Sequence, residues 1–219
     1  QVNYFDKAFH SLINFEIKWN AKQMAENDVF YKYDSILNGQ LKGYGVLNYM
    51  TSHDDGQPFD KEREMPYKTA TMLLLTPGTS QVYYGDEAAR DLTIEGTVGD
   101  ATLRSFMNWD AINSNDDTKK ILRHWQKLGQ FRANHMSVGA GKHQLISDEN
   151  GLVFSRIRKE DKVVMAINML EQNILIDVSS VFENGEKLRD FYSDKELAVV
   201  EGKVNFTSIY SVVLLEKIE

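Results

Sequence analysis

Two short polar clusters carry the residue types best suited to chemistry. His53, Asp54 and Asp55 follow one short apolar run, and Asp86 and Glu87 follow another. A carboxylate beside an imidazole can bind the hydroxyl groups of a ligand through charge-assisted hydrogen bonds, and it can shift the pKa of a neighbouring carboxyl group. By spacing alone, a structural turn explains His53 and Asp54 better than a binding site does. A cap or a salt bridge within a loop explains Asp86 and Glu87 better still.

The apolar periodicity predicts the elements that position these clusters. In a parallel α/β fold, functional groups lie at the carboxyl ends of the strands, and both clusters have that position in the sequence. Between the second cluster and the next helical pattern, residues 88–112 resemble a long loop with Gly96 and Gly99. The expected elements are helices over residues 5–26, 61–75 and 118–133 and strands over residues 45–50 and 80–84.

The last part of the chain has a different pattern. Between residues 151 and 217 it contains seven short runs rich in Val and Ile, separated by Gly, Asn, Asp and Glu. Runs of this length and spacing are typical of an antiparallel β-sandwich. The sequence therefore predicts an α/β segment over residues 1–138 followed by an all-β domain over residues 139–219.

Composition excludes several classes of site and partner. The chain has 25 Lys and Arg against 32 Asp and Glu, a net charge of −7, and this argues against nucleic acid as a partner. It has no Cys, which excludes disulfides and thiolate metal sites. The longest apolar run, Met72–Leu75, is too short to span a membrane. No metal site is predicted, because the oxygen-rich stretch Asn113–Asp117 is better explained as a helix cap than as a calcium site.

Three stretches resemble the α-amylase family of glycoside hydrolases, in the order and at the spacing of that family. NYMTSHDD, residues 48–55, resembles the region in which a barrel strand ends in Asn or Ser, His and Asp. ATMLLLTPGTSQVYYGDE, residues 70–87, resembles the helix, turn and strand that close the barrel. RSFMNW, residues 104–109, is similar to a segment of the following loop. YFDKAF, residues 4–9, also looks like the family's stretch after the sixth strand.

The resemblance implies a fold and roles for individual residues. The fold would be the C-terminal part of a (β/α)8 TIM barrel over residues 1–138, followed by an antiparallel β-sandwich over residues 139–219. Asp54 aligns with the third carboxylate of the family, which binds two adjacent hydroxyls of the sugar in the cleavage subsite and helps to distort its ring. His53 aligns with an imidazole that binds the same sugar. Arg104 and Trp109 could bind substrate at the rim, or could pack the loop.

The resemblance also implies what these residues lack. Retaining glycosidases need a nucleophile and a proton donor ~5–5.5 Å apart, and in this family they lie on the fourth and fifth strands. A complete barrel needs ~250 residues, more than residues 1–138 provide. We therefore expect a fragment that is inactive alone, and that pairs with the missing N-terminal half of the barrel or self-associates. The parent protein could carry a structural calcium, although no cofactor is evident here.

Several points stay open. Many family members carry an Arg a few residues after His-Asp, whereas here Gly56–Phe59 follow Asp55 and the next Arg is Arg63. The substrate would be an α-glucan such as starch, but the choice between hydrolysis and glucanotransferase activity is undecided. A non-catalytic relative of the same fold, used for glycan binding or as a partner subunit, is the alternative. Family resemblance suggests an extracytoplasmic location.

Overall fold

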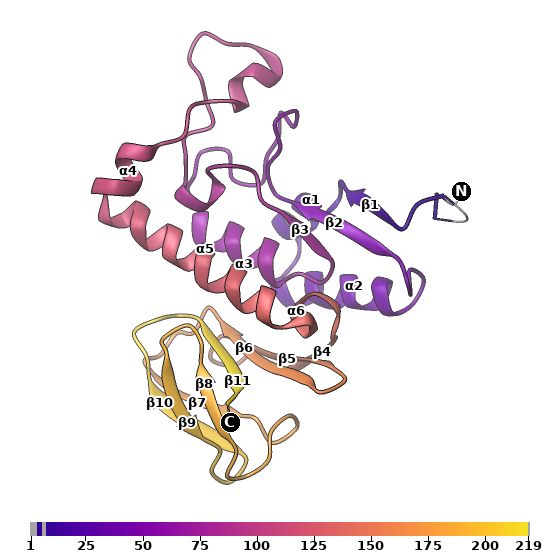
Figure 1. Ribbon diagram of the computed structural model, residues 1–219, viewed down its shortest axis with the longest axis vertical. Coiled ribbons are helices and arrows are strands. Elements are labelled where there is room, and N and C mark those ends of the chain that lie inside the picture. Colours follow the sequence, from indigo (N-terminus) through magenta and orange to yellow (C-terminus); the bar gives the residue numbers. More distant parts are fainter. Residues whose placement is uncertain (1–3, 6–7, 219) are drawn as a thin grey trace. The chain divides into compact units, whose positions relative to one another are not determined.

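The computed structural model of the protein describes residues 4–5 and 8–218 (Figure 1). The chain divides into two compact units, Gln1–Gln130 and Phe131–Glu219. This division falls inside the long helix α5, Asp116–Asn134, somewhat before the boundary expected after residue 138. The expected domain assignment therefore stays a prediction.

A parallel sheet in the order β1-β2-β3 forms the centre of the first unit. Two helices connect β1 to β2, and one helix connects β2 to β3, so helix and strand alternate as in the consecutive units of a parallel barrel. This agrees with the partial barrel predicted from the sequence. The strands are β1 (Ser11–Asn14), β2 (Gly45–Tyr49) and β3 (Thr79–Gln81), and the helices are α1 (Ile17–Gln23), α2 (Glu26–Asn38) and α3 (Pro66–Leu75).

Asn48, which is fully buried on β2, connects the three strands through its side-chain amide. Its Oδ1 accepts a hydrogen bond of 2.7 Å from Asn14 at the end of β1, and its Nδ2 donates one of 2.9 Å to the carbonyl of Pro77 just before β3. Gly78 makes this approach possible, because it has a φ of +114° and a Cβ there would lie 2.8 Å from Val46. The end of β2 is thus fixed between its two neighbours.

The helix expected over residues 5–26 is wrong in part. Ser11–Asn14 form strand β1 instead, and α1 begins only at Ile17. Leu12 and Ile13 fit helical spacing, but the backbone of this stretch pairs in parallel register with β2. Four residues of strand are too few to show a period of two, so the helical pattern of the following segment masked them.

The remainder of the first unit follows β3. It contains the short 3-10 helices η1 (Asp86–Ala88) and η2 (Gly99–Leu103), then α4 (Trp109–Ser114) and the start of α5. The predicted loop over residues 88–112 is therefore partly helical. Asn115 lies before α5 and accepts hydrogen bonds from the backbone N–H groups of Asp117 and Thr118, which is the cap that the sequence predicted.

The second unit is an antiparallel β domain. A six-stranded sheet has the order β4-β5-β6-β11-β8-β9, and β10 pairs with β7 in a separate two-stranded sheet. A short helix, α6 (Met136–Ala140), precedes the strands and contacts β5 and β6. The strands are β4 (Lys142–Ser147), β5 (Leu152–Arg158), β6 (Asp161–Ile167), β7 (Asn173–Asp177), β8 (Lys187–Asp190), β9 (Lys195–Ala198), β10 (Lys203–Thr207) and β11 (Val213–Lys217).

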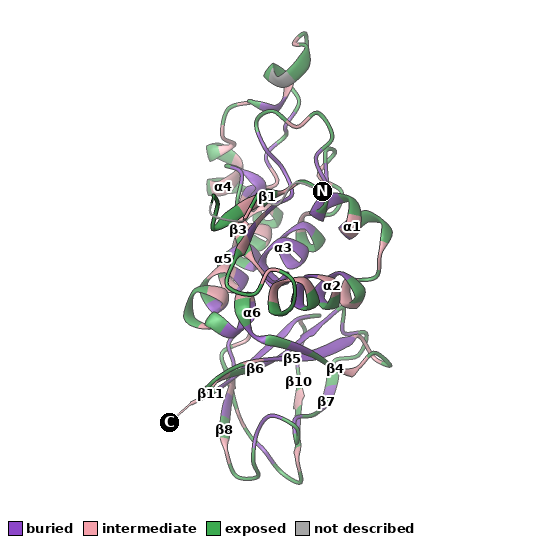
Figure 2. Ribbon diagram, turned by 90° about the vertical axis from the view of Figure 1, so that its right-hand side faces the viewer, coloured by how far each residue is buried: buried purple, intermediate pink, exposed green. Residues whose placement is uncertain are grey.

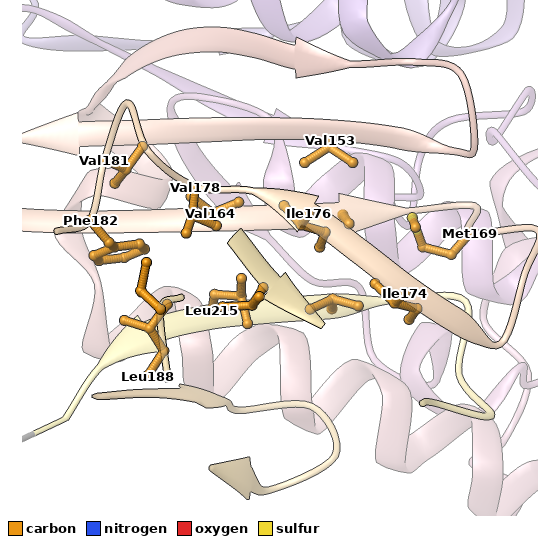
Figure 3. Packing of buried hydrophobic residues seen from close by; sticks show 14 residues of the cluster. Val153, Val164, Met169, Ile174, Ile176, Val178, Val181, Phe182, Leu188 and Leu215 are labelled. Carbon is orange, nitrogen blue, oxygen red and sulfur yellow. The ribbon is translucent and has the colours of Figure 1, made fainter. Parts of the chain in front are cut away.

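The hydrophobic core of this domain lies between its two sheets. Figure 3 shows Val164 of β6, Leu215 of β11 and Ile176 of β7 directed into one cluster. The central strands β5 and β6 are buried along most of their length, as their colour in Figure 2 shows. Burial of these apolar side chains stabilises the β domain, which has no disulfides. In the part of the chain that the structure describes, no helix is both long and apolar enough to cross a membrane.

Candidate active site

The turn after β2 presents His53 and Asp54 to solvent. Their side chains are 60% and 62% exposed, and His53 Nε2 lies 3.9 Å from Asp54 Oδ2. The Ser52 hydroxyl, which is nearly buried, donates a hydrogen bond of 2.7 Å to Asp54 Oδ1. The carboxylate is therefore oriented by the residue two positions before it, and its other oxygen faces His53.

Hydrogen bonding lowers the pKa of Asp54 below its usual value. The Ser52 hydroxyl contributes most, partial desolvation opposes it, and the charges of His53 and Arg104 act in the same direction as Ser52. Asp54 is consequently ionised at neutral pH. An exposed carboxylate held in one orientation is suited to accepting hydrogen bonds from neighbouring hydroxyl groups.

Arg104 is brought to the same place by the segment after η2. Its Nε donates a hydrogen bond of 3.3 Å to the backbone carbonyl of His53. Trp109 is 65% exposed at the start of α4, and no contact joins its described side chain to His53 or Asp54. The structure thus brings together three of the four predicted site residues.

Asp55 faces away from Asp54. Its carboxylate forms an ion pair with Lys18 of α1 in which the two side chains are only 13% and 6% exposed. The backbone N–H of Gln57 donates to its other oxygen at 3.0 Å. Burial, followed by the nearby charge of Asp55, raises the pKa of Tyr49 to about 12. Sequence reasoning missed Lys18, although a lysine next to the buried Ile17 was a usable signal.

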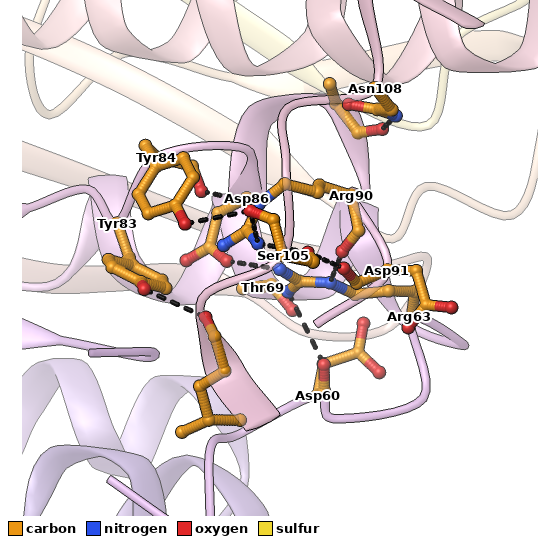
Figure 4. A network of polar contacts seen from close by, with 12 residues as sticks. Asp60, Arg63, Thr69, Tyr83, Tyr84, Asp86, Arg90, Asp91, Ser105 and Asn108 are labelled. Carbon is orange, nitrogen blue, oxygen red and sulfur yellow. Dashed lines mark hydrogen bonds and ion pairs between the residues drawn. The ribbon is translucent and has the colours of Figure 1, made fainter. Parts of the chain in front are cut away.

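In the second polar cluster, Asp86 is buried and Glu87 is half-buried. Arg63 Nη2 donates a hydrogen bond of 2.7 Å to Asp86 Oδ1, and the side chains are 9% and 0% exposed. Burial raises the pKa of Asp86, and the Arg63 charge opposes that rise. Figure 4 shows this pair beside Arg90, whose guanidinium lies 3.9 Å from the ring centre of Tyr84. Arg63, the first Arg after His53 and Asp54, therefore holds the segment around η1 that follows β3.

No group of three or more His, Asp or Glu side chains suited to a metal ion occurs within residues 4–5 and 8–218. His124 is buried, and its Nε2 lies 3.2 Å from the carbonyl oxygen of Tyr67. His135 lies between two carboxylates, with Nδ1 2.7 Å from Asp161 and Nε2 2.6 Å from Glu216. Both side chains have protein partners.

Comparison with known proteins finds similarity to α-amylases. A periplasmic α-amylase of Escherichia coli strain K12 is 34% identical over 169 residues, which are 75% of this chain and 24% of that protein. This chain matches the C-terminal portion of α-amylase family proteins. No family model matches the sequence.

Solved structures of the α-amylase family show the same fold. The α-amylase from H. orenii superposes with a TM-score of 0.66 at 21% identity, over 98% of this chain and 50% of that chain. AmyP in complex with maltose gives 0.65 at 13% identity, over 95% and 50%. The acarbose complex of the Geobacillus thermoleovorans α-amylase gives 0.65 at 19% identity, over 95% and 48%. The chain thus spans about half the length of these relatives. Of YFDKAF, the stretch that also resembles the family, Asp6 and Lys7 lie outside the described residues.

Proposed function

We propose that this chain is the C-terminal part of a retaining glycoside hydrolase that cleaves α-glucosidic bonds in starch or maltooligosaccharides. The observation that carries the proposal is the ionised, solvent-facing Asp54 beside His53 at the carboxyl end of β2. In this role Asp54 would bind two adjacent sugar hydroxyls, and His53 would bind the same ring. Arg104 would hold the backbone between them, and Trp109 would contribute at the rim.

The other acids that follow the strands are less suited to bind sugar there. Glu16 follows β1 but lies 3.8 Å from Lys32 of α2. Asp86 follows β3 and is paired with Arg63 in the interior. Retaining chemistry needs two carboxyl groups ~5–5.5 Å apart, and in the described part of the chain Glu16 after β1 and Asp86 after β3 each have a basic neighbour instead. We infer that the nucleophile and the proton donor come from another segment.

The edges of the parallel sheet support such a segment. Among the described residues, β1 and β3 each have a neighbouring strand on one side only. Large apolar side chains are exposed beside both edges, including Phe15, which is 66% exposed, and Val82, which is 45% exposed. Unpaired edges with apolar surface favour association with further strands. The partner would be the N-terminal half of the barrel or, in its absence, another copy of the chain.

An activity assay tests the proposal. A longer protein that carries this chain and the barrel half with the two acids should hydrolyse maltooligosaccharides and release products that retain the α-anomeric configuration. The 219 residues alone should give no turnover. Absence of turnover by the longer protein would refute the hydrolase, and turnover by the 219 residues would refute the assignment of the acids elsewhere.

Product analysis separates the nearest alternative. A glucanotransferase would form longer oligosaccharides from maltooligosaccharides, whereas a hydrolase would form shorter ones and reducing sugar. The location of the protein is also a proposal. We expect it outside the cytoplasm, because the similar E. coli protein is periplasmic.

A further inference from the structure

Next to the exposed Asp54, the chain places a second carboxylate that is largely shielded, with a side chain that is 13% exposed. Asp55 has three partners of different kinds: the Lys18 ammonium, the N–H of Gln57, and the Tyr49 side chain, whose pKa it raises. Two adjacent carboxylates with opposite surroundings suggest different tasks. The Asp54 carboxylate is open to a ligand, whereas the Asp55 carboxylate is engaged by its protein partners.

Helix α1 provides the other side of this arrangement. Lys18 is 5% exposed, and its ammonium lies 5.1 Å from the ring centre of Trp19 and 6.0 Å from that of Tyr49. One turn later, Lys22 donates a hydrogen bond of 3.0 Å to the backbone carbonyl of Pro58. Helix α1 therefore contacts the turn at two points, at Asp55 and at Pro58.

The base of the turn is also closed. The backbone N–H of Phe59 donates to the carbonyl of Met50 at 2.8 Å, so residues 51–58 form a loop with joined ends. Within that loop the paired Asp55 carboxylate is the anchor, and Asp54 precedes it by one residue. A change in the position of Asp55 would therefore move the Asp54 carboxylate.

We propose that the largely shielded ion pair between Lys18 and Asp55 is a positioning device that holds the carboxylate of Asp54 in place for the sugar ring. This inference rests on the proposed function, but its structural part can be tested independently. Removing one member of a buried pair leaves an uncompensated charge. In addition, a catalytic group displaced by about 1 Å can lose about 100-fold in rate.

The first test is kinetic and uses the longer, active protein. Lys18→Met and Asp55→Asn should each lower kcat about 10- to 100-fold and change KM less than about threefold. Lys18→Arg, which keeps the charge, should recover most of the loss. The matched control is Lys68→Met, which removes the more exposed pair of Lys68 with Glu26 at 3.0 Å and should leave kcat unchanged.

A second comparison distinguishes positioning from general support of the fold. If the pair acts through Asp54, then Lys18→Met should cause no further loss in an Asp54→Asn background, because residues that act as a unit are not additive. Equal losses in both backgrounds would overturn the proposal. So would a folded Lys18→Met protein with kcat within threefold of the wild type.

Hydrogen exchange tests the positioning without any activity. In the wild-type chain, the amide of Gln57 should be protected by Asp55, and Lys18→Met should accelerate exchange within residues 51–59 while the control Lys68→Met does not. Unchanged exchange in Lys18→Met would refute the positioning device even if the longer protein is an active hydrolase. Accelerated exchange in a protein without hydrolase activity would instead refute the proposed function and leave the structural anchor standing.

Discussion

Asp54 and Asp55 show how strongly one position in a turn changes the chemistry of a carboxylate. Asp54 is exposed and accepts a hydrogen bond from the Ser52 hydroxyl, while Asp55 is largely shielded by its ion pair with Lys18. The sequence shows both as adjacent acids in a polar cluster. Their separation depends on the direction of the backbone after β2, and the residue that pairs with Asp55 comes from a helix 37 positions earlier.

The Ser52 hydroxyl is the largest cause of the lowered pKa of Asp54, and its removal has a defined consequence. Ser52→Ala should raise the pKa of Asp54 toward its usual value, because the ionised carboxylate loses a hydrogen bond. NMR titration of the Asp54 side-chain carboxyl measures this directly. Ser114→Ala, which removes an exposed serine bonded to a backbone carbonyl, should leave the pKa of Asp54 unchanged. A pKa that stays the same or falls in Ser52→Ala would contradict the account.

At the scale of elements, the end of β2 depends on the close approach of the Pro77-Gly78 turn. Gly78→Ala should destabilise the protein by about 3 kcal/mol, since it combines a strained backbone with overlap on the Val46 side chain. Gly43→Ala is the matched control, because Gly43 has a φ of +90° with open space around it, and should cost about 1 kcal/mol. Chemical denaturation gives both values. Equal losses would show that the contact with Val46 has no effect.

The elements that carry the site were largely predictable. The strand before His53, helix α3 with Pro66 in its first turn, and the β-rich tail all follow from local pattern and punctuation. Strand β1 was not predictable by periodicity, because it is short and defined by pairing with β2. Strand β4 was missed for a related reason: its burial does not alternate, and its register shifts between Leu145 and Ser147.

The folded backbone, more than residue type, accounts for what the sequence did not show at the site. Lys18, Ser52 and Tyr49 are ordinary residues in the sequence, and only their burial around Asp54 and Asp55 reveals a role. Conversely, Asp86 and Glu87 look as suited to chemistry as His53 and Asp54. The Arg63 pair places Asp86 in the interior. The assigned roles of Asp54, His53, Arg104 and Trp109 stay predictions.

For the whole molecule, a buried histidine predicts how stability depends on pH. Burial lowers the pKa of His124 to about 4, with the carbonyl of Tyr67 opposing this, whereas the usual value is 6.5. Between pH 6.5 and 4, His124 is therefore protonated in the unfolded chain and neutral in the folded protein. The free energy of unfolding is therefore unaffected by His124 above pH 6.5, and it decreases by about 3 kcal/mol as the pH falls toward 4.

Chemical denaturation of the wild type and of His124→Gln at several pH values checks this. The difference in free energy of unfolding between the two should shift by about 2 to 3 kcal/mol in favour of the variant between pH 7.5 and pH 4.5. His10→Gln, at an exposed position, is the control. A difference for His124→Gln that is independent of pH would contradict the buried neutral imidazole.

The central claim is that Asp54 binds the sugar during cleavage in a longer α-amylase family enzyme. The most direct measurement is kcat/KM on a maltooligosaccharide for the longer protein with Asp54→Asn, compared with Asp148→Asn at an exposed position of the β domain. Asp54→Asn should lower kcat/KM at least about 100-fold, mostly through kcat, because the contact strengthens in the transition state. Asp148→Asn should match the wild type. A value for Asp54→Asn within about threefold of the wild type would contradict the account.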